Sequence, residues 1–174
     1  MKKKICIWQS AGVVFASLFG VLLHFLYELT GESKAAALIS AVNESTFEHM
    51  KLIFFPLFIF AVVQRFFFKE YRNFWCIKLA GILIGLISVP VLFYTYNGAV
   101  CKSGAVVNIG IFLLSVIISF ITEARLMKKK MSGCKYPAIS FAVICLIGIM
   151  FMIFTFFPPD ILLFKDPLTG TYGI

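Results

Sequence analysis

The sequence predicts an all-α, polytopic membrane protein with five transmembrane helices, its N-terminus in the cytoplasm and its C-terminal tail outside. Composition is the first reason, because 61% of the 174 residues are hydrophobic and 14% are charged, whereas soluble domains carry about 25% charged residues. The mean hydropathy is +0.98. Long apolar segments are the second reason, since a helix needs about 20 apolar residues to cross a bilayer. The placement of basic residues is the third.

Five apolar segments are long enough to span, and they cover residues 5–29, 45–68, 74–96, 106–127 and 136–157. The first follows three lysines but exceeds the about 7–15 apolar residues of a signal peptide, so an uncleaved helix is expected. The second has charged ends, yet residues 52–63 are uncharged. Pro56 and Pro90 lie inside the second and third segments, where proline kinks a helix. Two prolines end the fifth segment.

Residues 158–174 form a tail that is too apolar for a disordered segment. Its Asp-Pro and Thr-Gly pairs are turn signals. We therefore expect a single integral membrane domain, residues 1–174, with an ordered extracytoplasmic tail that packs against the outer face.

Basic residues set the predicted orientation, because Lys and Arg are retained on the cytoplasmic side during insertion. With the N-terminus inside, twelve of the sixteen Lys and Arg residues lie on that side. They gather at the N-terminus, between the second and third segments, and between the fourth and fifth. The net charge of +8 is then explained by the basic residues expected on the cytoplasmic side, which also attract anionic lipid. The lipid bilayer is the expected partner, and nucleic acid is not.

Cysteines and glycines bear on how the helices are joined. Of five cysteines, Cys101 alone is predicted outside, so no internal disulfide is expected. Gly81 and Gly85 form a small-residue stripe that suits close helix packing, within one chain or between chains. A homo-oligomer that uses this stripe is therefore one expectation.

Acidic and imidazole side chains concentrate at the outer face, where six of the eight acids and both histidines are predicted. His24 and Glu28, four residues apart, share one helix face, and Glu44, Glu48 and His49 open the second segment. Zinc sites that perform chemistry commonly use three ligands of these types. The sequence thus predicts zinc or another divalent metal on His24, Glu28 and His49, with Glu44 or Glu48 as a catalytic base. The corresponding function is a metal-dependent hydrolase of a lipid or envelope substrate.

Structural explanations compete with this interpretation. Ser45 and Glu48 match a capping box, in which each side chain bonds the other residue's backbone amide, and Asn43 is an alternative cap. His24 and Glu28 also suit a simple polar pair. Two further functions stay open: a small transporter or channel subunit, and a non-catalytic membrane partner or assembly factor.

Three blocks of sequence carry a resemblance, namely residues 22–28, 42–51 and 164–174. With these blocks the chain resembles a family of small bacterial multi-pass membrane proteins known as domain of unknown function 6512. The resemblance implies a bacterial plasma-membrane protein and assigns no activity. It also implies that the polar residues of the three blocks form one unit: His24, Glu28, Asn43, Glu44, Ser45, Glu48, His49, Asp166 and Pro167.

Overall fold

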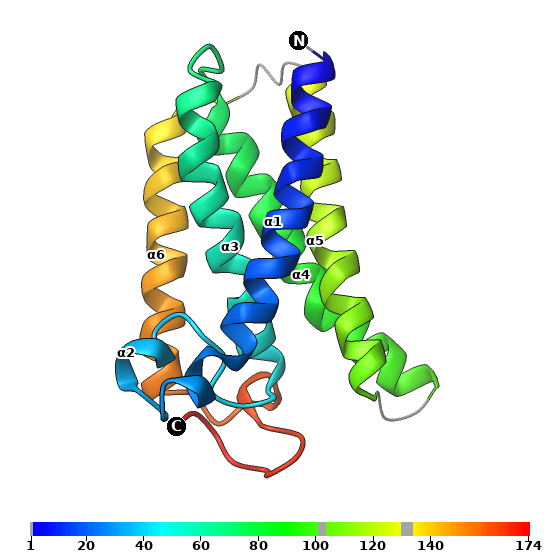
Figure 1. Ribbon diagram of the computed structural model, residues 1–174, viewed down its shortest axis with the longest axis vertical. Helices are drawn as coiled ribbons and strands as arrows, with labels where there is room; N and C mark the ends of the chain where they lie inside the picture. The colour runs from blue at the N-terminus through cyan, green and yellow to red at the C-terminus, as the bar shows by residue number, and fades with distance from the viewer. Residues whose placement is uncertain (1, 101–103, 130–133) are drawn as a thin grey trace.

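The computed structural model, which describes residues 2–100, 104–129 and 134–174, is a bundle of helices (Figure 1). The elements are α1 (Lys2–Leu29), α2 (Lys34–Ala37), α3 (Thr46–Phe67), α4 (Phe74–Ala99), α5 (Ala105–Lys128), α6 (Pro137–Phe156) and the 3-10 helix η1 (Leu162–Phe164). The described residues contain no β-strand, only one isolated bridge between Lys165 and Tyr172. Five of these helices are long and apolar enough to cross a membrane. The predicted fold class is confirmed.

The N-terminus and the C-terminal tail lie at opposite ends of the bundle (Figure 1), as five crossings require. We call the end with the N-terminus and residues 68–73 the inner end. The end with residues 30–45 and the tail is the outer end. These names follow the distribution of basic residues, which predicts that the N-terminus is cytoplasmic.

Local chemistry accounts for several helix boundaries. The Ser45 hydroxyl caps α3 by accepting a hydrogen bond from the backbone amide of Glu48, at 3.3 Å. Pro137 lies in the first turn of α6, where a missing N–H costs nothing. α6 ends at Phe156, shortly before two prolines. α4 continues to Ala99, beyond the predicted end at residue 96.

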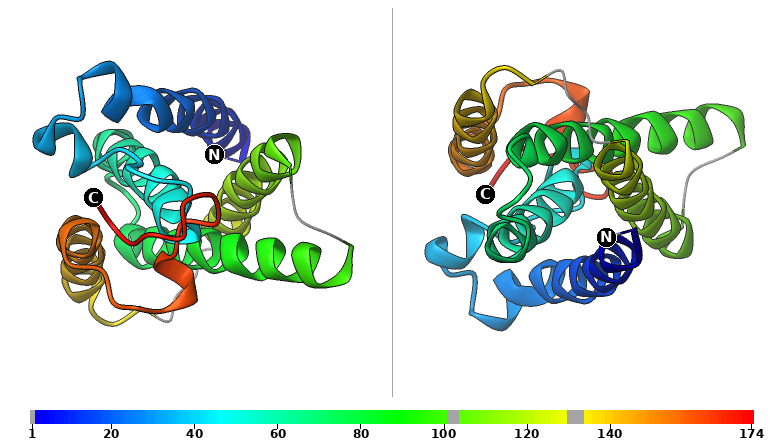
Figure 2. Two further views of the ribbon diagram at one scale, coloured as in Figure 1. Left: turned by 90° about the horizontal axis from the view of Figure 1, so that it is seen from below. Right: turned by 90° about the horizontal axis from the view of Figure 1, so that it is seen from above.

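α3 is the central helix of the bundle. It contacts α1, α4, α5 and α6, and end-on views show it among them (Figure 2). Its apolar span is 56% buried, a larger share than in any other spanning helix. Polar residues at the ends of α3 therefore meet partners from several elements.

Aromatic rings fill much of the interior. Phe47 stacks on Phe164 with ring centroids 4.2 Å apart, and Phe60 meets Phe120 edge to face at 5.6 Å. Both arrangements are favourable for aromatic pairs. Because lipid tails are as apolar as these side chains, close packing stabilises the bundle more than the hydrophobic effect does.

Gly81 and Gly85 join α4 to α5 within the chain. A Cβ atom at Gly81 would collide with the Glu123 side chain, and one at Gly85 would lie 3.0 Å from the Ser119 Cβ atom. The stripe therefore serves packing inside one chain, so it is not available as the surface for a second copy. The oligomeric state itself stays a prediction.

A disulfide bond joins Cys76, near the start of α4, to Cys134, just before α6. The expectation of no internal disulfide is therefore wrong. The two Cα atoms are 6.3 Å apart although 58 residues separate them in the sequence. The prediction used only the side of the membrane on which each cysteine was expected. The sequence does not show which segments meet at the inner end.

The tail folds back onto the outer end. Phe164 is buried against Phe47, and Asp166 closes a turn in which its side chain accepts hydrogen bonds from the Leu168 amide and the Thr169 hydroxyl. The side-chain amide of Asn43 donates to the carbonyl of Gly173 at 3.0 Å. The tail and residues 30–45 therefore support each other.

Candidate functional site

A cavity of about 240 Å³ lies between α1, α3 and α5 at the outer end. We call this cavity, together with the polar residues at its end, the outer pocket. Its polar residues are His24 of α1, Glu44, His49 of α3 and Asn108 of α5. Its apolar lining consists of Gly20, Val21, Phe25, Leu52, Ile109 and Phe112.

Two imidazoles converge on one carboxylate in the outer pocket. His24 Nε2 lies 3.6 Å from Glu44 Oε1, and His49 Nε2 lies 3.6 Å from Glu44 Oε2. The two imidazole ring centroids are 5.8 Å apart. Each oxygen of Glu44 thus faces a different histidine.

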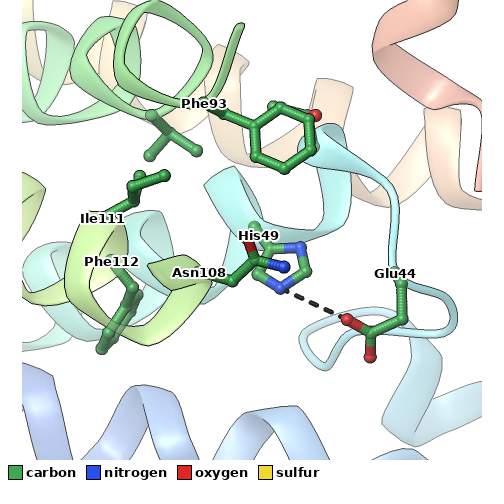
Figure 3. A pocket seen from close by; sticks show the side chains of 8 residues that line it. Glu44, His49, Phe93, Asn108, Ile111 and Phe112 are labelled. Carbon is green, nitrogen blue, oxygen red and sulfur yellow. Dashed lines mark ion pairs between the residues drawn. The ribbon is translucent and has the colours of Figure 1, made fainter. Parts of the chain in front are cut away.

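Backbone geometry orients His49. Its Nδ1 lies 2.9 Å from the carbonyl oxygen of Ser45, and a carbonyl oxygen only accepts hydrogen bonds, so Nδ1 carries the proton. In a neutral imidazole the lone pair is then on Nε2, the atom that faces Glu44. Asn108 lies beside this ring at the mouth of a small neighbouring cavity (Figure 3).

A neutral His49 imidazole in this position would face Glu44 with its lone pair, which is unfavourable. A bare Nε2 lone pair and a carboxylate oxygen are both electron-rich, so they repel each other unless a cation lies between them. Either a proton on Nε2 or a metal ion satisfies the geometry. His24 Nε2 faces the other oxygen of Glu44. Its buried Nδ1 has no hydrogen-bond partner among the described residues, so no contact there fixes its tautomer.

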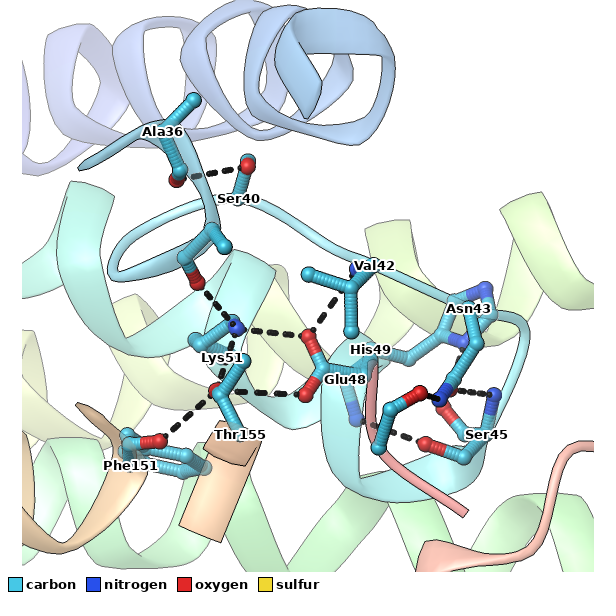
Figure 4. Close-up of polar contacts among 12 residues, drawn as sticks. Ala36, Ser40, Val42, Asn43, Ser45, Glu48, His49, Lys51, Phe151 and Thr155 are labelled. Carbon is cyan, nitrogen blue, oxygen red and sulfur yellow. Dashed lines mark hydrogen bonds and ion pairs between the residues drawn. The ribbon is translucent and has the colours of Figure 1, made fainter. Parts of the chain in front are cut away.

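A buried polar network holds the segment that carries Glu44. Lys51 Nζ lies 2.6 Å from Glu48 Oε2 and donates to the Ala37 carbonyl at 2.9 Å and the Thr155 hydroxyl at 2.7 Å. Glu48 Oε2 also accepts from the backbone amide of Val42, at 3.2 Å. We call these five residues the Lys51 network (Figure 4). It fastens residues 37–42 to α3 and α6, and so limits where Glu44 can lie.

The structure separates the predicted site residues into two groups. His24, Glu44 and His49 meet in the outer pocket, whereas Glu28 is exposed and does not line it. Glu48 belongs to the Lys51 network, so it is not placed to act as a base in the outer pocket. Among residues 2–100, 104–129 and 134–174, no group of three or more His, Cys, Asp or Glu side chains is arranged so that it could hold a metal ion as the side chains stand.

The capping-box interpretation is half right. Ser45 accepts from the Glu48 amide as predicted. The amide of Ser45 instead donates to the side chain of Asn43, at 2.9 Å. Glu48 turns toward Lys51 because a buried ammonium requires a counter-charge.

Asn108 is a pocket residue that sequence reasoning missed. Its signal was a single carboxamide in the first turn of an otherwise apolar segment. Its Oδ1 is buried and has no hydrogen-bond partner within the described part of the chain. A polar atom in that state is available to a ligand in the pocket.

A second buried ion pair lies at the inner end, where Lys78 of α4 meets Glu123 of α5, each with a side chain 1% exposed. The Lys78 ammonium also lies 5.5–5.9 Å from three aromatic ring centroids, those of Phe60, Phe74 and Phe120. We call this group the inner pair. Neither Lys78 nor Glu123 lines the outer pocket.

Five apolar helices, with a pocket at one end that carries four polar side chains, define a small multi-pass helical membrane protein. The sequence matches the Family of unknown function (DUF6512) over residues 1–174, and the chain belongs to that family. The resemblance seen in the three sequence blocks is confirmed. No curated protein and no solved structure matches the chain.

Proposed function

We propose that the outer pocket binds a divalent metal ion, with zinc as the first candidate, through His24, Glu44 and His49. The observation that carries this proposal is the convergence of two imidazole Nε2 atoms on the two oxygens of one carboxylate. Three His and carboxylate ligands with an open fourth position are typical of zinc sites that bind a substrate.

The distances support the choice of ligands. Ligand atoms about 2.1 Å from a tetrahedral zinc ion are about 3.4 Å from each other. Both His–Glu44 distances are 3.6 Å, close to that spacing. Metal binding would require the three side chains to move toward a common centre, because they do not form a metal site as they stand. The hydrogen bond from His49 Nδ1 to a backbone carbonyl is also the outer-shell contact that metal-bound histidines commonly make.

The substrate class follows from where the pocket lies. It is at the outer end of spanning helices, which the distribution of basic residues places outside the cytoplasm, and it is mostly apolar. We propose a lipid or envelope molecule as the ligand. We propose binding and no hydrolytic step, because hydrolysis also needs a base and Glu48 is engaged by Lys51. A bound divalent metal would supply Lewis-acid chemistry at the open position.

Elemental mass spectrometry tests the metal site. The protein is purified in detergent without metal-affinity chromatography, reconstituted with zinc and desalted. We expect about one zinc per chain in the wild type, from the single site proposed, and loss of zinc in His24→Ala, Glu44→Gln and His49→Ala. Glu28→Gln is the matched control, since it changes an exposed carboxylate on the same helix as His24 and should retain zinc.

Two results would overturn the proposal. A wild type that retains no metal after reconstitution would mean that protons, and not a metal ion, lie between the two histidines and Glu44. Undiminished zinc in both histidine variants would place the metal elsewhere. Size-exclusion chromatography and circular dichroism on each variant separate loss of metal from loss of fold.

A further inference from the structure

We infer that the outer pocket holds one hydrocarbon chain of a phospholipid from the surrounding leaflet, with the lipid phosphate at His24, Glu44 and His49. The pocket is divided by chemistry. Its four polar side chains gather at one end, and its other lining residues are apolar: Gly20, Val21, Phe25, Leu52, Ile109 and Phe112. A ligand with a charged head and an apolar tail matches that division.

The rim of the cavity faces the bilayer. Val21, Phe25 and Ile109 line it and are 48%, 49% and 55% exposed. They lie on α1 and α5, which are both spanning helices, so their exposed surfaces contact lipid. Figure 1 shows that α1 and α5 lie together toward the inner end and separate toward the outer end. A ligand can therefore enter sideways between them.

The interior of the cavity is closed by buried side chains. Leu52 is 3% exposed and Phe112 is 7% exposed, and both line the cavity. Gly20 packs directly against Phe112, because a Cβ atom there would collide with the Phe112 ring. The cavity thus runs from lipid-facing residues to residues that bulk lipid does not reach.

The size of the cavity suits part of one chain. A dry apolar cavity of about 150 Å³ holds benzene, and this cavity measures about 240 Å³. The rest of the lipid would remain in the leaflet. Because a chain that leaves the bilayer for an apolar cavity gains little, contacts with the head must supply the selectivity.

The proposed binding of the lipid phosphate depends on the proposed metal site. The proposed position of the hydrocarbon chain does not. A divalent cation with Glu44 and two neutral imidazoles carries one net positive charge. Such a centre attracts an anionic phosphate oxygen to its open position. Asn108 also lines the cavity, and its side-chain NH2 group is the kind of donor that a phosphate oxygen accepts from.

Photocrosslinking tests the chain position. The protein is reconstituted in phosphatidylcholine vesicles that contain a phosphatidic acid with a diazirine on one acyl chain, illuminated, and mapped by peptide mass spectrometry. We expect crosslinks at the buried residues Leu52 and Phe112. The Val21→Trp/Ile109→Trp double variant fills the rim and should reduce those crosslinks several-fold. Leu18→Trp is the matched control, because it is 69% exposed on α1, does not line the cavity, and should leave them unchanged.

The outcomes separate this inference from the proposed function. Crosslinks confined to lipid-facing residues in a protein that retains zinc would overturn the lipid inference and leave the metal site standing. Crosslinks at Leu52 and Phe112 that persist without zinc and after chelation would support the chain position and overturn the role of metal in holding the head. Crosslinks at both residues that weaken on chelation or in Glu44→Gln would support both. All variants are compared at equal recovery of monodisperse protein.

Discussion

The two buried ion pairs of this bundle are satisfied in different ways. At the outer end, Lys51 Nζ has three oxygen partners, contributed by Glu48, the Ala37 carbonyl and the Thr155 hydroxyl. At the inner end, Glu123 is the one oxygen partner that Lys78 has among the described residues, and aromatic rings occupy its other sides. Both pairs are almost fully buried.

The difference shows what each pair can accomplish. The Lys51 network satisfies backbone groups of residues 37–42, so it positions the loop that carries Glu44. The inner pair connects side chains of α4 and α5 and satisfies no backbone group in the described residues. The outer network therefore orders a site, and the inner pair joins two helices.

Removing one partner of the inner pair should have the largest effect on stability. In Glu123→Ala the Lys78 ammonium stays buried without a carboxylate, and breaking such a pair costs about 3–5 kcal/mol. Glu48→Ala also removes a counter-charge, and the Val42 amide loses its acceptor. We nevertheless expect a smaller loss than in Glu123→Ala, because Lys51 keeps two oxygen partners. The measurement is the free energy of unfolding in mixed detergent micelles, followed by tryptophan fluorescence.

An exposed pair provides the control for this comparison. Glu70 and Lys4 lie 3.6 Å apart with side chains about half exposed, and such pairs contribute about 0–1 kcal/mol. Glu70→Ala should therefore be nearly neutral. Equal losses in Glu123→Ala and Glu48→Ala would show that the oxygen partners of Lys51 do not compensate, which contradicts the proposed difference.

The helices, but not their pairings, could be predicted from the sequence. A bilayer admits few structures other than a helix of sufficient apolar length, so five apolar segments were enough to predict five helices. Lys78 lies near the start of the third apolar segment, and nothing in the local sequence pattern identifies Glu123, 45 residues away, as its partner. Cys76 and Cys134 were missed for the same reason.

Replacing both charges of each pair sharpens the contrast. For Lys78→Met/Glu123→Leu we expect stability within about 1 kcal/mol of the wild type, because apolar residues often substitute for an isolated buried pair. Lys51→Met/Glu48→Leu leaves the Ala37 carbonyl and the Val42 amide without these partners. Each such buried group costs about 1–3 kcal/mol, so for the two groups we expect a loss of about 2–6 kcal/mol. The same unfolding assay measures both.

Zinc content is measured on the same two double variants. The outer double variant should also lose zinc affinity, because the loop that carries Glu44 is released. The inner double variant should retain it. Loss of zinc in the inner variant alone would show that the inner pair, and not the Lys51 network, positions the outer pocket.

Helical spacing alone predicts only part of the candidate site. The spacing of four between His24 and Glu28 correctly implies neighbouring positions on α1, yet the Glu28 side chain is exposed. Glu44 lies in a loop, so no periodicity describes its position, and its approach to both histidines depends on the Lys51 network. Lys51 itself offered a signal, since a lysine inside an apolar helix needs a buried partner.

The smallest effect concerns the cap of α3 and tests whether stability and ligand geometry are separable. Ser45→Ala removes the hydroxyl that accepts from the Glu48 amide and should cost about 1 kcal/mol. Ser33 is the matched control, because it occupies the N-cap of α2 without a side-chain capping bond, and Ser33→Ala should change stability by less. His49 is oriented by the backbone carbonyl of Ser45, which alanine preserves. Ser45→Ala should therefore retain zinc despite its lower stability. Loss of zinc at full recovery of folded protein would instead mean that the cap, and not the carbonyl, sets the direction of the imidazole.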